Sequence, residues 1–286
     1  MQNLKVTLIQ SDLAWENREA NLRNFEEKIA AAGRETDIII LPEMFSTGFS
    51  MKPEEFAEPE GAATVEWMRA QAQKSGAAVT GSIMVEDGGS FYNRLLFVEP
   101  GGRVSFYDKR HLFSMGGEDN HFAAGKNDVI ISYKGVNIKF LICYDLRFPV
   151  WAKNNYRNDR YEYDVLLIVA NWPAVRSRVW KTLLSARAIE NQAYVVGVNR
   201  IGNDGNGLPH SGNSNVVDPK GIPVLDDVAN EEFIKTVSLD IAGLYEFRDK
   251  FTVGPDWDVF DIKKEITAEK SGDKYSDRKS QSAYDG

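Results

Sequence analysis

The chain contains a single cysteine, Cys143, at a position where a strand is expected to end. The run 136–142 before it is typical of a half-buried strand with an apolar end, and the composition of 144–149 indicates a turn and the start of a helix. A thiol between a strand end and a helix N-terminus can be exposed, and its thiolate is stabilised there. A lone cysteine in an intracellular protein is nevertheless more often a small buried hydrophobe. Other residues must decide whether Cys143 is a nucleophile.

Three more chemically capable side chains follow predicted strands. Glu43 comes just after the buried run 37–41, where apolar neighbours favour a carboxyl group that works as a general base. Lys109 comes just after the predicted strand 103–107, and Glu118 lies in the next loop. Each has a simpler explanation, because exposed loops and turns are rich in charged residues. Together they supply a base, a cation and a second carboxylate to accompany the thiol.

These side chains can meet only if the strands before them end at one site. Apolar and alternating runs predict the strands 6–10, 37–41, 77–85, 91–98, 103–107, 129–132, 136–142, 164–170, 194–198 and 233–239, with a short one around 216. Helical spacing predicts helices over 17–32, 62–75 and 175–191, and 202–215 is a glycine- and asparagine-rich loop. Strands outnumber helices and hairpins intervene, which favours two sheets packed face to face with helices outside.

Composition restricts the class of protein. At 286 residues and 32.1 kDa, with 43% apolar and 27% charged residues, the chain can form a globular protein with a large core. Its net charge of −8 and pI near 5.1 argue against nucleic acid or an anionic membrane as a partner. No run approaches the roughly 20 apolar residues of a membrane span. A single cysteine excludes an internal disulfide and fits a reducing compartment, so the cytoplasm is the expected location.

The four candidate residues lie within segments that resemble a known family. Leu-Pro-Glu-Met-Phe at 41–45, Asp-Lys-Arg-His-Leu-Phe at 108–113 and Ile-Cys-Tyr-Asp-Leu-Arg-Phe-Pro at 142–149 are similar to the three motifs of the nitrilase, or carbon–nitrogen hydrolase, superfamily. Flanking matches lie at 170–173, 187–192, 198–202 and 204–214. The resemblance spans roughly residues 4 to 255, which is nearly the whole chain outside its polar C-terminal end.

The resemblance implies an α/β (α+β) fold, a four-layer α-β-β-α sandwich, for a catalytic domain at 1–262. It also implies a Glu43–Lys109–Cys143 triad, with Glu118 beside it, and at least a homodimer. No metal or cofactor is required. The residues 263–286 are rich in Lys, Glu, Ser and Asp, so we expect a polar tail that is mobile or clasps a partner subunit.

The implied chemistry is amide hydrolysis. Glu43 would take the proton of the Cys143 thiol, while Lys109 and the backbone N–H of Tyr144 would stabilise the oxyanion. A thioester would form, and water activated by Glu43 would release the acid. Glu118 would orient the substrate or the water and hold Lys109.

The motif variants are most similar to the bacterial omega-amidases, which act on short 2-oxo acid amides such as 2-oxoglutaramate and 2-oxosuccinamate. Such a substrate needs a cationic anchor far from the sulfur, best supplied by arginine. The candidate anchors are Arg110, Arg147, Arg176 and Arg178, of which Arg147 also lies in the cysteine motif. The aromatic and sulfur side chains that could wall a small pocket, each with a core role as the alternative, are Phe45, Phe113, Met115, Tyr144 and Trp172.

Several alternatives stay open. Related amidases act on N-carbamoyl amino acids or deaminated glutathione, whereas the motif variants disfavour a nitrile substrate. A different class is a non-enzymatic binding module with Cys143 as a redox sensor. Asp145 and Arg147 could pair with each other, and His111 is expected to brace its loop rather than to activate the thiol. One cysteine and three scattered histidines lack the spacing of a zinc site.

Overall fold

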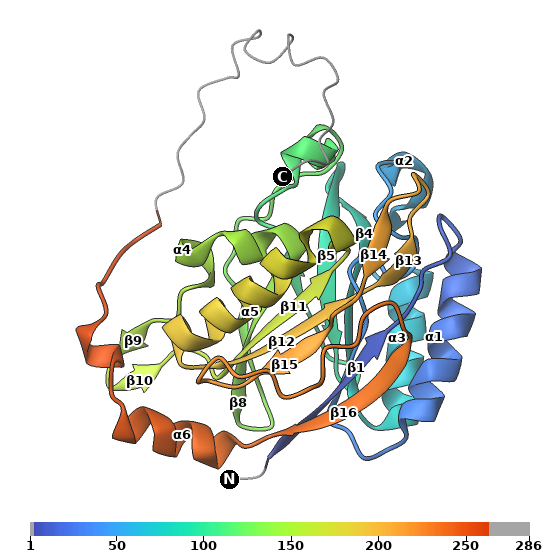
Figure 1. Cartoon of the computed structure of the whole chain (residues 1–286). Coiled ribbons are helices and arrows are strands. Elements are labelled where there is room, and N and C mark those ends of the chain that lie inside the picture. The colour runs from blue at the N-terminus through green and yellow to red at the C-terminus, as the bar shows by residue number, and fades with distance from the viewer. Residues whose placement is uncertain (1–2, 263–286) are drawn as a thin grey trace, which may run out of the picture.

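A computed structural model of the chain describes residues 3–262 and contains two sheets that pack face to face (Figure 1). The first sheet has seven strands in the order β16-β1-β2-β4-β5-β6, and β3 also pairs with β4. Its strands are β1 (Leu4–Gln10), β2 (Ile38–Ile40), β3 (Glu58–Pro59), β4 (Ala78–Asp87), β5 (Ser90–Val98), β6 (Val104–Asp108) and β16 (Phe233–Leu239). Strands β1, β2 and β4 run parallel, with α1 (Arg18–Ala32) between the first two and α3 (Ala63–Ser75) between the last two.

The second sheet has five strands in the order β15-β12-β11-β8-β7. Its strands are β7 (Ile130–Tyr133), β8 (Val136–Ile142), β11 (Val165–Ala170), β12 (Tyr194–Asn199) and β15 (Asn215–Val217). Strands β8, β11 and β12 run parallel, and α5 (Ser177–Asn191) connects β11 to β12. Both sheets therefore combine parallel strands, which need long crossovers, with antiparallel neighbours, of which β4–β5, β5–β6 and β7–β8 are joined by hairpins.

Strand β2 explains how the layers are held together, because both of its faces are buried. Ile38 and Ile40 contribute to the core between the two sheets, whereas Ile39 contributes to the core beneath α1 and α3. Across the inter-sheet core, the ring of Phe97 lies 5.7 Å from that of Phe140. Burying such runs of aliphatic side chains on both faces is typical of parallel strands covered by helices.

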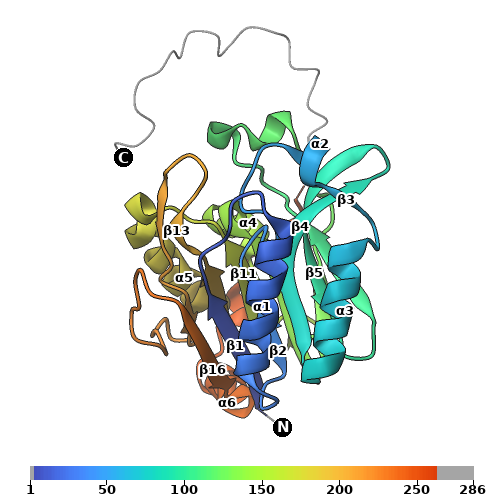
Figure 2. The same ribbon diagram turned by 90° about the vertical axis from the view of Figure 1, so that its right-hand side faces the viewer.

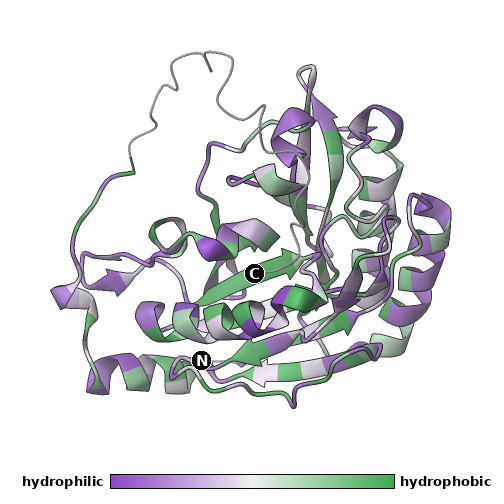
Figure 3. Cartoon of the chain, turned by 45° about the horizontal axis from the view of Figure 1, so that its top comes forward, coloured by the Kyte–Doolittle hydropathy of each residue, from purple (hydrophilic) through white to green (hydrophobic). Residues whose placement is uncertain are grey.

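The resulting layers are helix, sheet, sheet and helix. Helices α1 and α3 lie side by side over the seven-stranded sheet (Figure 2), and α5 covers the five-stranded sheet on the other side. Hydrophobic residues concentrate on the central strands, while the outer helices also carry hydrophilic ones (Figure 3). The predicted α+β sandwich is confirmed.

The helix boundaries follow from local signals. The Asn17 side chain accepts a hydrogen bond from the Ala20 N–H and caps α1, and Gly33 ends it with a φ of 73°. Gly76 ends α3 in the left-handed conformation, with a φ of 73°. Both ends agree with the sequence prediction.

Some elements were not predicted. The supposed loop 202–215 contains the hairpin of β13 (Ile201–Asn203) and β14 (Pro209–Ser211). Helix α6 (Ile241–Lys250) begins after Asp240, whose side chain accepts the Gly243 N–H, and it buries Leu244 and Arg248. The other short elements are α2 (Pro53–Phe56), α4 (Pro149–Ala152), β9 (Tyr156–Arg157), β10 (Arg160–Tyr161) and the 3-10 turns Ser114–Gly116, Glu118–Asn120, Cys143–Arg147, Ala174–Arg176 and Gly254–Asp256.

The predicted tail at 263–286 lies outside the described residues. Among residues 3–262, no helix combines the length and the apolar character needed to cross a membrane.

Candidate active site

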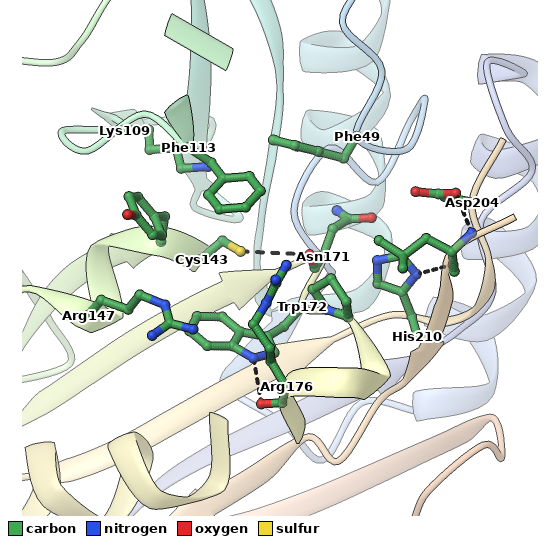
Figure 4. Close-up of a pocket in the computed structure, with 13 residues that line it drawn as sticks. Phe49, Lys109, Phe113, Cys143, Arg147, Asn171, Trp172, Arg176, Asp204 and His210 are labelled. Atoms are coloured by element: carbon green, nitrogen blue, oxygen red, sulfur yellow. Dashed lines mark hydrogen bonds between the residues drawn. The ribbon is translucent and has the colours of Figure 1, made fainter. Parts of the chain in front are cut away.

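Four strands of the two sheets end at one place. Glu43 and Lys109 lie shortly after β2 and β6 of the seven-stranded sheet, and Cys143 and Asn171 come directly after β8 and β11 of the five-stranded sheet. Figure 4 shows Lys109, Cys143 and Asn171 around the same pocket. The site is therefore assembled across the interface between the sheets.

Lys109 forms a buried ion-pair cluster with two carboxylates. Its Nζ donates to Glu43 Oε1 at 2.9 Å, to Glu118 Oε2 at 2.8 Å and to Glu118 Oε1 at 3.0 Å. All three side chains are at most 1% exposed. Burial on its own would lower the pKa of Lys109, but the charges of Glu118 and Glu43 outweigh it and raise that pKa above its ordinary value. The ammonium is therefore fixed in its charged form.

The buried Glu118 carboxylate bonds both to Lys109 and to the backbone of Phe113. Burial raises its pKa above the usual carboxyl range, and the nearby Lys109 ammonium opposes the rise. Its Oε2 also accepts the backbone N–H of Phe113 at 2.6 Å. Glu118 therefore links the Lys109 ammonium to the segment that carries Phe113.

Two asparagines hold the Glu43 carboxylate. Asn93 Nδ2 donates to Glu43 Oε1 at 2.8 Å and also to Glu118 Oε1 at 3.2 Å. The backbone N–H of Asn171 donates to Glu43 Oε2 at 2.7 Å, and its side-chain amide donates to the Glu43 carbonyl at 2.6 Å. We did not predict a role for either asparagine. Asn171 had a signal, because it follows an apolar run as Cys143 does, whereas Asn93 lies inside a strand beside Arg94 and had none.

Cys143 sits on a sharp turn at the end of β8. Its φ is 45°, a left-handed conformation that is uncommon for a residue other than glycine, and a 3-10 turn begins at this residue. Its Sγ lies 3.8 Å from the carbonyl oxygen of Asn171. A strained backbone at such a position often marks a functional residue.

The pKa of the Cys143 thiol is raised well above its ordinary value, mainly by burial and then by the Glu43 carboxylate. The expectation that a thiolate is stabilised at this position, between a strand end and a helix N-terminus, was wrong. Lys109 does favour the thiolate, but its charge is matched by two carboxylates, so burial prevails. The direction of this shift favours the neutral thiol over the thiolate.

Asp145 ties the cysteine turn to the segment after β6. Its Oδ2 accepts the Tyr107 hydroxyl at 2.7 Å and the Ile142 N–H at 3.1 Å. Its Oδ1 lies 2.9 Å from the His111 backbone nitrogen and 2.8 Å from His111 Nδ1. The suggested pairing of Asp145 with Arg147 was wrong, since these hydrogen bonds occupy both carboxylate oxygens. His111 braces the loop as expected.

A small pocket of about 70 Å³ opens over Cys143 (Figure 4). Its lining includes three of the predicted aromatic residues, Phe113, Tyr144 and Trp172. The full lining consists of Phe49, Lys109, Phe113, Cys143, Tyr144, Arg147, Asn171, Trp172, Pro173, Arg176, Asp204, Leu208 and His210.

Two predicted wall residues lie elsewhere. Phe45 is fully buried beneath the helices, with its ring 5.6 Å from that of Phe25, because Gly81 leaves room for it on that face of the sheet. Met115 is 69% exposed, since it lies on a short surface turn outside the pocket lining. The prediction that Phe45 and Met115 line the pocket was therefore wrong.

Of the four candidate anchors, Arg147 and Arg176 line the pocket. Arg110 lies over the ring of Trp151 at 4.8 Å, and Arg178 is exposed; neither is part of the lining. No group of three or more His, Cys, Asp or Glu side chains within residues 3–262 is placed to hold a metal ion.

Residues 5–249 match the family model of the carbon–nitrogen hydrolases. The chain belongs to the carbon–nitrogen hydrolase family. It is 46% identical to the omega-amidase YafV of Escherichia coli K12 over 263 residues, covering 91% of this chain and 99% of that protein. It is 32% identical to the 2-oxoglutaramate amidase of Bacillus subtilis 168, covering 88% and 96% of the two chains.

A solved structure of another carbon–nitrogen hydrolase has the same fold. XC1258 from Xanthomonas campestris, which carries an arsenic adduct in its active site, superposes with a TM-score of 0.90 at 39% identity. The match covers 92% of this chain and all of that one.

The arrangement in this carbon–nitrogen hydrolase is suited to acyl transfer. A thiol lies beside a carboxylate that can take its proton, and a fixed ammonium is bonded to that carboxylate. The backbone N–H of Tyr144, the residue after the thiol, can serve as a second donor to a developing oxyanion. An amide carbon held in the pocket would meet all of these groups together.

Proposed function

We propose that this carbon–nitrogen hydrolase is an omega-amidase. It would hydrolyse the terminal amide of small 2-oxo dicarboxylic acid monoamides to the acid and ammonia. The observation that carries the proposal is the buried Glu43–Lys109–Glu118 cluster beside Cys143 at the base of a small pocket. The names of the relatives in Escherichia coli and Bacillus subtilis support the substrate class.

In the first step, Cys143 Sγ attacks the amide carbon while Glu43 takes the thiol proton. The raised pKa of the thiol makes the base necessary, because little thiolate exists beforehand. A carbon–sulfur bond forms and the carbonyl oxygen becomes an oxyanion, which accepts hydrogen bonds from Lys109 and the Tyr144 N–H. Each oxyanion donor typically contributes about 2.7–4 kcal/mol of transition-state stabilisation.

In the second step, Glu43 returns the proton to the amide nitrogen, the carbon–nitrogen bond breaks and ammonia leaves. The acyl group stays on Cys143 as a thioester. Water then gives a proton to Glu43 and attacks the thioester carbon; the carbon–sulfur bond breaks, the thiol is restored and the acid departs. Glu118 keeps Lys109 in place and orients the substrate amide or the water.

We propose Arg147, Phe113 and Trp172 as substrate-binding residues, with Tyr144 contributing its ring as well as its N–H. Phe113 and Tyr144 have ring centroids 5.1 Å apart and form one wall. Arg147 lies over the ring of Trp172 at 5.0 Å, which places its charge beside an apolar wall. Such a pocket suits a short acyl chain with a charged end.

A substrate panel tests the proposal. Wild-type protein should release ammonia from 2-oxoglutaramate or 2-oxosuccinamate, and Cys143→Ala should release none. Intact mass with a slow substrate should reveal an acyl adduct on wild type, and Glu43→Gln should lack it. Turnover only with N-carbamoyl amino acids, or only with deaminated glutathione, would replace the substrate class. Activity that survives in Cys143→Ala would exclude the covalent mechanism, and no turnover of any amide would favour a redox-sensing binding module.

We also propose that residues 1–262 form one catalytic domain and that it assembles as a homodimer. Large apolar side chains gather near the outer side of α5, where a groove is lined in part by Ile189, Phe247, Phe251 and Trp257. The side chains of Ile189 and Phe251 are 57% and 60% exposed, and a partner subunit would remove this apolar surface from water.

We propose a cytoplasmic location, because the reaction needs a free thiol.

A further inference from the structure

A separate hairpin forms one side of the pocket. Strands β13 and β14 pair with each other in a two-stranded sheet that is distinct from the two large ones. The hairpin projects beyond the ends of the large sheets (Figure 1 and Figure 2). It contributes Asp204, Leu208 and His210 to the pocket lining. Because the ladders of the large sheets do not include this hairpin, other contacts must fix its position.

The buried side chain of Arg200 supplies such contacts. Arg200 directly precedes β13 and is 0% exposed. Its Nε donates to the Ile201 carbonyl at 2.8 Å, and its Nη2 donates to the Asn203 carbonyl at 3.0 Å. The same Nη2 donates to Asp12 Oδ1 at 2.6 Å. Since Asp12 lies shortly after β1, one guanidinium joins the hairpin to the end of a strand in the seven-stranded sheet.

The hairpin and the segment after β1 are in close contact. Asp12 and Ile201 form an isolated parallel bridge. A Cβ atom on Gly202 would lie 2.2 Å from Asp12 Oδ1. A Cβ atom on Gly205 would lie 2.2 Å from Trp15 Nε1. Glycine, which lacks this atom, allows the close approach. The hairpin is therefore seated on the segment that follows β1.

The charge of Arg200 also acts on His210 in the second strand of the hairpin. Burial, and then the charge of Arg200, lower the pKa of His210 to about 4, although Asp204 opposes them. The ring is therefore neutral at pH 7. Its Nδ1 lies 3.0 Å from the Leu208 carbonyl oxygen. Because His210 is 4% exposed, its pKa reports how closely the hairpin is packed.

We propose that Arg200 is a positioning residue that holds the β13–β14 hairpin as an end wall of the pocket and thereby limits the length of the acyl chain. The inference rests on the proposed amidase function and adds the element that selects among its substrates. Figure 4 shows Asp204 and His210 on the opposite side of the pocket from Cys143. The part of an acyl chain that is remote from the amide would therefore meet the hairpin.

The small size of the pocket makes the position of this wall important. Its volume is about 70 Å³, which leaves little room beyond a short acyl chain. One additional methylene group in a pocket typically changes discrimination between substrates about 10- to 200-fold. A hairpin that moved outward would admit a longer chain and would hold the short chain less well. Arg200 would thus influence substrate choice without contacting the substrate.

The test is a series of 2-oxo monoamides that differ by one methylene group, from 2-oxosuccinamate through 2-oxoglutaramate to 2-oxoadipamate. Arg200→Met keeps a long side chain but removes the hydrogen bonds of the guanidinium. It should raise KM for the substrate that wild type prefers about tenfold and change kcat by less than about threefold. The preference in kcat/KM for that substrate over the next longer amide should fall at least about tenfold.

The matched control is Arg248→Met, which removes another buried arginine. The bonds of Arg248 to Asp164, Tyr163 and Gln192 lie outside the pocket lining. This variant should lower the free energy of unfolding without altering the chain-length preference. A change of preference in Arg248→Met as large as that in Arg200→Met would overturn the proposal, because any loss of stability would then have the same effect.

Gly205→Ala is a second variant that removes no buried charge. Its new Cβ atom would press on Trp15 and displace the hairpin, so the preference should shift in the same direction as in Arg200→Met. If Arg200→Met and Gly205→Ala reduce turnover equally for every chain length, the proposal is overturned, since the hairpin would then set no limit on length.

Two further measurements do not depend on turnover. In NMR titrations, with the His210 signal identified by its loss in His210→Gln, Arg200→Met should raise the pKa of His210 from about 4 toward the ordinary value of about 6.5. Limited proteolysis should cut within 202–209 faster in Arg200→Met than in Arg248→Met. If wild type hydrolyses no amide, the proposed function fails. An unchanged His210 pKa and unchanged proteolysis in Arg200→Met would overturn the positioning role in either case.

Discussion

Cys143 illustrates how burial and charge shift the pKa of a thiol. Its thiol lies beside both a lysine and a carboxylate, yet its pKa is raised, because desolvation exceeds what the compensated Lys109 can offer. A neutral thiol with a base beside it is protected from oxidation, which requires thiolate character. The same arrangement disfavours the redox-sensor alternative, since a sensor benefits from a lowered pKa.

The raised thiol pKa predicts a pH dependence of stability. In the unfolded chain, the thiol ionises above about pH 8.5, whereas in the folded chain it stays protonated to higher pH. Its contribution to the free energy of unfolding is therefore complete below the unfolded pKa and declines as the pH rises above it. Between pH 7 and pH 9.5, wild type should lose more free energy of unfolding than Cys143→Ser, as measured by urea denaturation. Parallel losses in the two proteins would mean that the folded thiol titrates normally.

At the scale of residues, the sequence indicated the side chains that we propose to react more readily than the side chains that hold them. Glu43, Lys109 and Cys143 each lie in a motif at the end of a predicted strand, so their types and order were informative. Asn93 lies within a strand, where nothing in a linear pattern says that its side chain faces two carboxylates contributed by other elements. Phe45 was wrongly predicted to line the pocket, because aromatic side chains are common both in pockets and in the hydrophobic core, where Phe45 lies.

At the scale of elements, the end of β6 and the turn after β8 behave as one unit. They belong to different sheets, and Asp145 joins them through Tyr107 and His111. Tyr107 also accepts the Trp151 indole N–H at 2.9 Å. The unit fixes the distance between the segment that carries Lys109 and the segment that carries Cys143.

We predict that Asp145→Asn lowers kcat by about tenfold or more and changes KM by less than about threefold. An asparagine side chain would present N–H groups to donors that now face a carboxylate, and each unsatisfied buried donor costs about 1–3 kcal/mol. The pocket wall is retained, so substrate binding should persist. Steady-state kinetics would measure both constants, with circular dichroism to verify folding.

The matched control is Asp218→Asn, which alters an aspartate whose side chain accepts the backbone N–H groups of Lys220 and Ile222 in its own turn. It should leave kcat unchanged. If Asp145→Asn raised KM and left kcat unchanged, that result would contradict a positioning role for Asp145.

The sequence also predicted some helices and strands better than others. Long apolar runs such as 165–170 were assigned correctly, because few other structures accommodate six consecutive buried residues. Helix α6 was missed, since its sequence is mixed and its stability depends on partners distant in the chain. Arg248 in that helix bonds to Asp164 Oδ1 at 2.7 Å and to the Tyr163 carbonyl at 2.8 Å, contacts that no local pattern reveals.

At the scale of the whole molecule, the layered fold leaves α5 on an outer face beside exposed apolar side chains. If this face pairs two subunits, Ile189→Glu should shift the mass measured by light scattering from dimer to monomer, because a buried carboxylate would lie in an apolar interface. Val150→Glu is the matched control, since Val150 is equally exposed at 56% but does not line the groove. A monomeric wild type, or a dimer that tolerates Ile189→Glu, would contradict this pairing.

The division of the site between two sheets has a practical consequence. A cut in the exposed segment 126–128 would leave Glu43, Lys109 and Glu118 on one fragment and Cys143 on the other. Strand β16 of the second fragment pairs with β1 of the first, so the fragments have a large surface for reassociation. Neither fragment holds a complete site. The protein is therefore a natural basis for a split reporter, in which ammonia release signals that two fusion partners have met.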